Sequence, residues 1–262
     1  MADEEQARTP FLTQLRSLGG VYWIANWMEL VERFAYYGVR TAVPIFIVLA
    51  ISDGGPGLTH EQKGDLFGIW ALVQSFVPIF TGVYADRYGY KLNIAIATAL
   101  KIVGYLVMAY CMRIAEAVAG MPLAEARAAG VDHVYEIFFA GAMFVALGTA
   151  IFKPGVQGLL ATKLPDKSSS LWWGLFYQMV NIGGFVGPLV GGYLQVLDWE
   201  WVFLSCTIGV SLNFIPLFFF EEPAKGGVND ERSAWGRIVD AGKGRLEPRL
   251  FFFTIAFAGF WL

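Results

Sequence analysis

Hydrophobic and polar positions are sharply separated along this chain. Residues 66–85, 168–197 and 201–220 form stretches of 20, 30 and 20 residues with no Asp, Glu, Lys or Arg. A helix needs about 20 apolar residues to cross the hydrocarbon core of a bilayer. The pattern therefore predicts an all-α membrane protein in which most charged residues lie in short connecting segments.

We expect six membrane-spanning helices and the beginning of a seventh. The predicted spans are residues 21–51, 64–85, 92–112, 134–162, 168–197 and 201–220. They form a bundle over residues 21–220, after an N-terminal segment (1–20) that includes a short amphipathic surface helix at 11–18. A linker follows at 221–248. Residues 249–262 are apolar but too short to cross a bilayer at about 1.5 Å per residue, so we expect them to be a truncated seventh helix.

Composition agrees with a membrane protein. Of the 262 residues, 56% are apolar and only 16% are charged, against about 25% charged in a soluble domain. This excludes an ordinary soluble enzyme, a disordered chain and a nucleic-acid binder. His60 and His133 fall in loops, and the spans contain no metal or nucleophile pattern, so we expect neither an enzyme nor a metal site. Cys111 and Cys206 lie in apolar runs, which favours buried core residues over a disulfide or metal site.

The distribution of basic residues predicts the orientation. The acidic start lacks the basic region of a secretory signal, so we expect the first span to direct insertion. With the N-terminus inside, only Lys63, Arg113 and Arg127 of the 19 basic residues fall in outside loops. Basic residues favour the cytoplasmic side. We therefore expect a multi-pass protein of a cell membrane (plasma or bacterial inner), with the N-terminus and the linker in the cytoplasm and the lipid bilayer as a partner.

Charged residues in the first span form a second pattern. At about 100° per residue, Glu29, Glu32, Arg33, Tyr36 and Arg40 fall on one side of the helix. A charge at the bilayer centre costs several kcal/mol, so such residues normally have a partner or line a water-filled pathway. The pattern predicts a pathway for protons and substrate. A buried ion-pair network that only joins this helix to its neighbours would give the same pattern.

The fourth span contributes a further charge, Lys153, beside Pro154. The first span has a proline as well, at Pro44. Interrupted helices at corresponding places in repeated units indicate a binding site, and these spans would each begin one of two inverted three-helix repeats. Lys101 lies nearer the end of its span, so we expect it to snorkel or pack. Glycines four residues apart in the fifth span predict close helix packing; they are Gly183, Gly187 and Gly191.

The loop between the second and third spans carries a longer motif, Gly82-x-x-x-Asp86-Arg87-x-Gly89-x-Lys91. It resembles the loop signature of the major facilitator superfamily, in which its role is structural and conformational. Glycines permit a tight turn here, and we expect Asp86 to accept hydrogen bonds from helix ends or basic groups.

Three more motifs resemble those of the proton-dependent oligopeptide transporters, a family within that superfamily. In the order of the chain they are E-x-x-E-R-F-x-Y-Y-G-x-R at Glu29 to Arg40, G-x-x-x-x-K-P at Gly148 to Pro154, and F-Y-x-x-x-N-x-G at Phe176 to Gly183. Two positions depart from the family pattern. Ser75 stands where a tyrosine is usual, and Gly155 stands where asparagine is frequent.

The resemblance implies the N-terminal half of a major facilitator, working as a proton-coupled importer of di- or tripeptides or related carboxylate-bearing solutes. The proton would be the coupling ion, with no other cofactor, and the C-terminal half would be missing. A major facilitator for a non-peptide solute and a non-transporting truncated product are the alternatives. The implied roles are proton coupling at Glu29, Glu32, Arg33 and Lys153, and substrate binding at Tyr36, Tyr37, Arg40, Lys153 and Asn181.

Overall fold

The computed structural model describes residues 18–162, 164, 169–222 and 236, and in these residues every regular element is helical. The expected surface helix at 11–18 falls almost wholly outside the described residues. So do the expected seventh helix at 249–262 and most of the linker at 221–248. The long helices are α3 (Gly20–Phe46), α4 (His60–Tyr88), α5 (Tyr90–Ala109), α8 (Val134–Ala161), α9 (Ser169–Leu194) and α10 (Trp199–Ser211).

These helices correspond in order to the six predicted spans. The sixth is broken, because α10 is followed after a short turn by α11 (Phe214–Leu217). The helices α4, α5, α8 and the α10–α11 stretch are long and apolar enough to cross a membrane. The charge-bearing α3 and the glycine-rich α9 have comparable lengths, 27 and 26 residues.

Two loops differ from the prediction. α3 ends at Phe46 rather than near residue 51, and the chain turns through a short 3₁₀ helix, η1 (Ile51–Asp53), to Gly54 at φ +80°. The segment between the third and fourth spans folds into two short helices, α6 (Cys111–Ala119) and α7 (Leu123–Ala128). The side chain of Arg127 fixes this hairpin to the preceding loop, donating hydrogen bonds to the carbonyls of Pro56 and Gly57, both at 2.8 Å.

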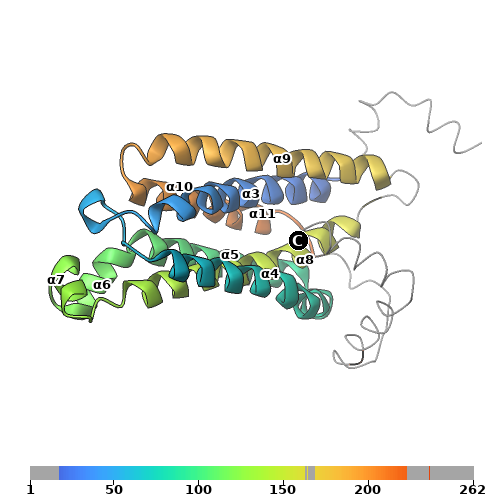
Figure 1. Cartoon of the computed structure of the whole chain (residues 1–262). Helices are drawn as coiled ribbons and strands as arrows, with labels where there is room; N and C mark the ends of the chain where they lie inside the picture. The colour runs from blue at the N-terminus through green and yellow to red at the C-terminus, as the bar shows by residue number, and fades with distance from the viewer. Residues whose placement is uncertain (1–17, 163, 165–168, 223–235, 237–262) are drawn as a thin grey trace, which may run out of the picture.

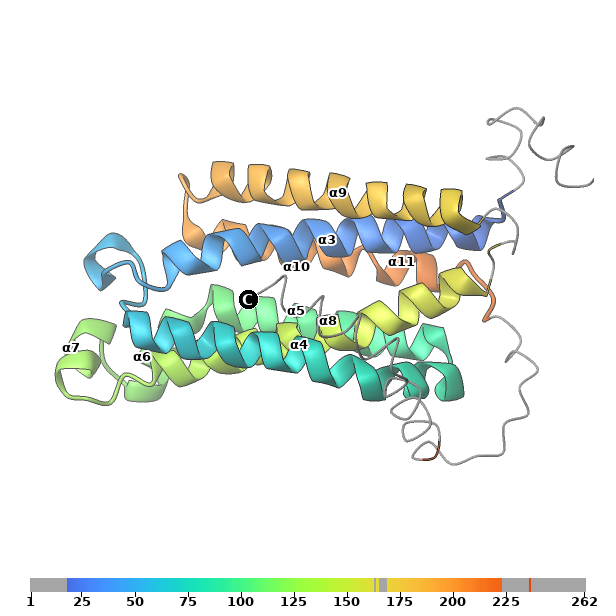
Figure 2. The same cartoon turned by 45° about the vertical axis from the view of Figure 1, so that its right-hand side comes forward.

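The two three-helix sets, α3–α5 and α8–α10, each pack their first helix against the other set (Figures 1 and 2). α3 packs on α9 and α10, and α8 packs on α4 and α5. The first helix of each three-helix set thus packs on the last two helices of the other set. Two interlocked repeats, as expected from the sequence, produce this arrangement.

Close packing of α9 on α3 depends on the predicted glycines. A Cβ atom at Gly187 would lie 2.2 Å from the carbonyl oxygen of Phe34, and one at Gly183 would lie 2.4 Å from that of Leu30. Real side chains do not approach backbone so closely. The packing role predicted for this glycine face is therefore confirmed.

The proline in α8 is accommodated by a neighbouring helix. Pro154 has no N–H, so the carbonyl of Ala150, four residues earlier, loses its helical partner. The hydroxyl of Thr81 on α4 donates to that carbonyl at 3.0 Å. α8 is therefore continuous through Pro154 and held against α4, and α3 is likewise continuous through Pro44, so the interruptions expected at these prolines are not found.

Candidate transport site

A polar layer separates two apolar clusters in the interior of the bundle. On α3, Met28 belongs to one cluster and Ala35 to the other, with Glu32 between them. On α5, Lys101 lies in the same way between Ala97 and Tyr105. The charged side chains therefore meet about midway along the helices, where hydration is least available.

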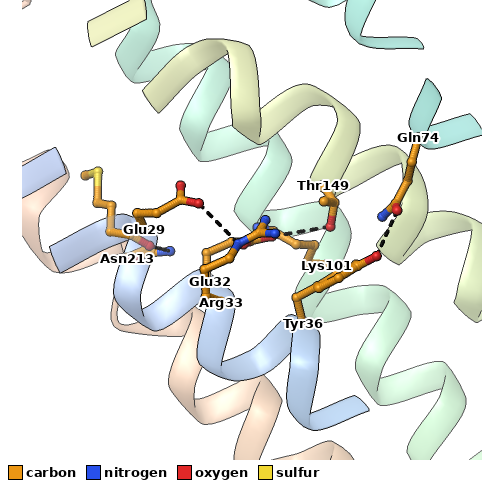
Figure 3. A network of polar contacts seen from close by, with 9 residues as sticks. Glu29, Glu32, Arg33, Tyr36, Gln74, Lys101, Thr149 and Asn213 are labelled. Atoms are coloured by element: carbon orange, nitrogen blue, oxygen red, sulfur yellow. Dashed lines mark hydrogen bonds and ion pairs between the residues drawn. The ribbon is translucent and has the colours of Figure 1, made fainter. Parts of the chain in front are cut away.

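Arg33 joins the two carboxylates of the first span (Figure 3). Its Nε lies 3.2 Å from Glu29 Oε1, and its Nη2 is in ion-pair contact with Glu32 Oε2. All three side chains are at most 4% exposed. Three residues of the predicted face, Glu29, Glu32 and Arg33, thus form a connected ion-pair network, as their spacing on α3 allows.

Lys101 is the main difference from the sequence prediction. It does not snorkel to the membrane surface, and it is more than a packing residue. Its side chain is 0% exposed, and its Nζ lies 3.3 Å from Glu32 Oε1. The hydroxyl of Thr149 on α8 donates to the same oxygen at 3.4 Å. The sequence did not indicate this contact, because α5 reaches Glu32 only through its packing on α8 and α10, which in turn contact α3.

No ion pair joins Lys153 to the network within the described residues. Its side chain is exposed on α8, and the ion pair found for Glu32 on the α5 side is made by Lys101. Within the described residues, Lys153 is therefore a cation at the open side of the network.

The predicted substrate-lining residues are only partly brought together. The hydroxyl of Tyr36 donates to Gln74 Oε1 on α4 at 2.9 Å, and its ring lies 5.0 Å from the Arg33 guanidinium. Tyr37 packs edge-on against Tyr36 and its ring faces Gly184 of α9. Asn181 is exposed on α9 and is not joined to the network. Gln74 was not foreseen, although it adjoins the atypical Ser75.

Arg40 lies farther along the same face of α3. Its guanidinium lies over the aromatic rings of α4, 4.3 Å from the centroid of Phe67 and 5.4 Å from that of Trp70. Its Nη1 is buried and has no hydrogen-bond partner among the described residues. Aromatic faces stabilise a guanidinium without using its donors, so Arg40 keeps its hydrogen-bonding capacity.

The two departures from the family pattern have structural counterparts. A Cβ at Gly155 would lie 2.4 Å from Asn93 Oδ1 of α5, so a side chain cannot be placed there without moving Asn93. The hydroxyl of Ser75 donates to the Ala71 carbonyl of its own helix at 2.8 Å. The neighbouring Gln74, rather than Ser75, makes the polar contact with Tyr36.

The loop motif forms the joint between α4 and α5. Gly89 has φ +104°, a conformation that favours glycine, and Gly82 packs near Pro154 of α8. Asp86 accepts a hydrogen bond from the Tyr90 hydroxyl at 2.9 Å instead of capping a helix end. Arg87 and Lys91 stack on the aromatic rings of Tyr88 and Phe220, respectively.

The cap that was expected from Asp86 comes from Glu222, just after α11. Its carboxylate oxygens accept hydrogen bonds from the backbone N–H groups of Tyr90 and Lys91, at 2.6 and 2.9 Å. A carboxylate at a helix N-terminus satisfies free donors and interacts favourably with the helix dipole. Glu222 therefore ties the end of the sixth span to the start of the third.

Replacing Glu222 with alanine is expected to destabilise the protein by about 1 kcal/mol, because the first N–H groups of α5 lose their acceptor. Thermal unfolding of the purified protein measures this. The neighbouring Glu221 is exposed, and its alanine variant is the matched control with an expected change below about 0.5 kcal/mol. Equal melting temperatures for the two variants would argue against the cap.

The cysteines are free and buried, as the sequence predicted. Among the described residues, no group of three or more His, Cys, Asp or Glu side chains is arranged to hold a metal ion. The ionic chemistry seen in the interior of the bundle is that of the network around Glu32.

Comparisons with known proteins agree with this architecture. A family model described as "Major Facilitator Superfamily" matches residues 28–262. The chain is 27% identical over 223 residues to the peptide transporter YePEPT of Yersinia enterocolitica, an alignment that covers 82% of this chain and 40% of that protein. It is 23% identical over 216 residues to the quinolone resistance protein NorA of Staphylococcus aureus, covering 82% of this chain and 46% of that protein.

A solved structure has the same fold. A POT family transporter crystallised with a thioalcohol-conjugated peptide superposes with a TM-score of 0.57 at 17% identity, covering 92% of this chain and 47% of that one. The chain thus spans less than half the length of these relatives.

The chain belongs to the major facilitator superfamily, as a multi-pass membrane protein with the fold of half a major facilitator. Within that superfamily, the matches to peptide transporters confirm the resemblance found in the motifs.

Proposed function

We propose that this chain supplies the first bundle of a proton-coupled transporter that imports small peptides or related carboxylate-bearing solutes. The observation that carries the proposal is the sequence of groups along one face of α3. The buried network of Glu29, Glu32 and Arg33 is followed by Arg40, whose Nη1 has no partner among the described residues. Carboxylates for protons and a free guanidinium for an anion are thus available on one helix.

The proton is the proposed coupling ion, and the mechanism uses no other cofactor and no chemical conversion of the solute. A buried carboxylate beside a cation exchanges readily between a charged, paired state and a protonated, neutral state when the cation moves. Arg33 contacts both carboxylates, and Lys153 stands at the open side of the network. The peptide transport function in the name of the Yersinia relative supports the choice of solute.

The complete site would include a second bundle. Alternating access in this superfamily rocks one bundle against another around a site between them. The chain covers 40% of the Yersinia relative, so a further bundle of similar size would form the wall opposite α3. The N-terminus and the segment after Glu222 would lie in the cytoplasm, in accordance with the distribution of basic residues.

A peptide amide is expected to compete at least about tenfold less well for uptake than the free acid of the same sequence. Amidation removes the charge that the Arg40 fork would bind, and charged hydrogen-bonded contacts typically contribute 2–5 kcal/mol. Competition against a labelled dipeptide in proteoliposomes that contain the complete protein measures this. Equal competition by acid and amide would contradict a carboxylate site.

Export of an apolar drug is the second candidate, because the chain also matches a quinolone resistance protein. The same assay separates the two functions. A drug exporter would give no saturable uptake of the labelled dipeptide, whereas the importer would take it up and be inhibited by free peptides.

A further inference from the structure

Lys101 is a buried cation that the proposed mechanism has not yet used. Its side chain is 0% exposed, and the residues flanking it along its face of α5, Ala97 and Tyr105, belong to the apolar clusters. An isolated ammonium in such a place is very costly unless it is paired. Its Nζ lies 3.3 Å from Glu32 Oε1, which supplies the pairing.

Helix α8 is shaped to hold this lysine. A Cβ at Gly148 would lie 2.5 Å from Lys101 Cγ and 2.7 Å from the carbonyl oxygen of Ala97, so the absence of a side chain there lets α5 and the stem of Lys101 approach α8 closely. One residue later, the Thr149 hydroxyl donates to the same Glu32 oxygen that faces Lys101. One helical turn later, the ring centroid of Phe152 lies 3.9 Å from Nζ. Three residues on one face of α8 thus fix the ammonium in position.

The two carboxylates consequently have unequal surroundings. Glu32 has a cation at each oxygen, Lys101 at Oε1 and Arg33 at Oε2. Glu29 has Arg33 at Oε1, whereas its buried Oε2 has no hydrogen-bond partner among the described residues. With both carboxylates ionised, the four charges of this network balance.

We propose that Lys101 is a positioning residue that keeps Glu32 ionised throughout the transport cycle, so that Glu29 alone carries the coupled proton. The proposal deepens the proposed function and rests on it. The proton would come from water on the outside, bind at Glu29 Oε2 while Arg33 remains paired with Glu32, and leave to water on the cytoplasmic side. No other bond is made or broken.

The neighbouring helices present few other ionisable groups to this pair. The groups near Lys101 and Glu32 are Glu29, Arg33 and Tyr36 on α3, Tyr105 on α5 and Lys153 on α8, and Cys206 on α10 lies near Tyr105. Among them, only Glu29 is a second carboxylate, so it is the alternative proton carrier within the described residues.

The test compares Lys101→Gln with the double variant Lys101→Gln/Glu32→Gln in the complete protein, reconstituted in liposomes. In the single variant, two carboxylates share the one cation Arg33, so one of the carboxylates retains a proton. Proton-driven accumulation of a dipeptide should fall at least about tenfold, because the carboxylate that has lost its cation keeps its proton through the cycle. Counterflow exchange without a gradient should remain measurable, and its pH profile should move to higher pH. The double variant restores the charge balance and should recover accumulation.

A matched glycine pair tests the position of the lysine without changing any charge. Gly148→Ala should push α5 away from α8, move Lys101 away from Glu32 and so reduce accumulation, whereas Gly68→Ala, at a glycine with nothing within 4 Å of the added atom, should not. Normal accumulation by Lys101→Gln, or a double variant no better than the single one, would overturn the proposal.

A second readout separates this proposal from the choice of solute. The pH dependence of the melting temperature reports proton binding without any substrate. This pH dependence should be reduced most by Glu29→Gln. It should be kept in Lys101→Gln/Glu32→Gln. If the pH dependence of the melting temperature is lost in Glu32→Gln and kept in Glu29→Gln, Glu32 is the proton carrier and the proposal is wrong, whatever the solute. If the pattern holds but no peptide is transported, only the proposed function fails.

Discussion

Replacement of Arg33 by methionine is expected to abolish proton-driven uptake and to destabilise the protein by about 3–5 kcal/mol. Arg33 contacts both Glu29 and Glu32, and all three side chains are at most 4% exposed. Removing one partner of a buried ion pair leaves the other charge uncompensated, which accounts for a loss of that size. Thermal unfolding of the purified protein and peptide accumulation in proteoliposomes measure the two effects.

Two control variants define what Arg33 contributes. Arg87→Met removes a basic residue that is exposed, and it should change stability by less than about 0.5 kcal/mol. Arg33→Lys keeps the charge but loses the planar fork that reaches two carboxylates, so it should recover part of the stability and little of the coupling. A melting temperature for Arg33→Met close to that of the unaltered protein would contradict the network described for α3.

Replacement of Arg40 by methionine is expected to weaken binding of a free peptide by at least about tenfold and to leave binding of its amide unchanged. The guanidinium lies over Phe67 and Trp70, and its Nη1 has no partner among the described residues. Losing one member of a charged pair typically costs 2–5 kcal/mol. Measuring both ligands on both proteins isolates the interaction between Arg40 and the carboxylate.

A lysine at position 40 adds a third protein to this comparison of acid and amide. Arg40→Lys keeps a positive charge without the bidentate geometry, so its preference for the free acid should be intermediate. If Arg40→Met weakens acid and amide equally, Arg40 supports the helix or its aromatic contacts, and the carboxylate is bound elsewhere.

Sequence periodicity was sufficient to predict the charged face of α3, because that face depends only on helical geometry. Glu29 and Arg33 are one turn apart, and any helix would bring them together. The glycine face of α9 was predictable for the same reason. Its spacing alone indicates a close contact, and the structure identifies the partner as α3.

The contacts that the sequence did not reveal join residues far apart in the chain. Lys101 and Glu32 are separated by 69 positions, and Glu222 and Tyr90 by 132. The sequence-based expectation for Lys101 was snorkelling or packing, although the residue lies about midway along α5, and nothing local to it indicates the carboxylate that it meets. The α6–α7 hairpin was missed because its residues mix polar and apolar positions without the length of a span.

Gly155 shows how tertiary packing accounts for a motif departure. The pattern of α8 alone suggests only a missing asparagine. In the folded bundle, Asn93 of α5 comes so close that an added Cβ would lie 2.4 Å from its Oδ1. A side chain at position 155 would therefore displace Asn93, a constraint that the sequence of α8 by itself does not indicate.

The measurement that tests the central claim most directly is dipeptide accumulation by the complete protein in liposomes with an imposed proton gradient. The account predicts accumulation above the external concentration when the outside is acidic, its collapse on adding a protonophore, and its absence in Glu29→Gln with counterflow retained. Uptake to the same equilibrium level with and without the gradient would contradict proton coupling, and no saturable peptide uptake under either condition would contradict the proposed function.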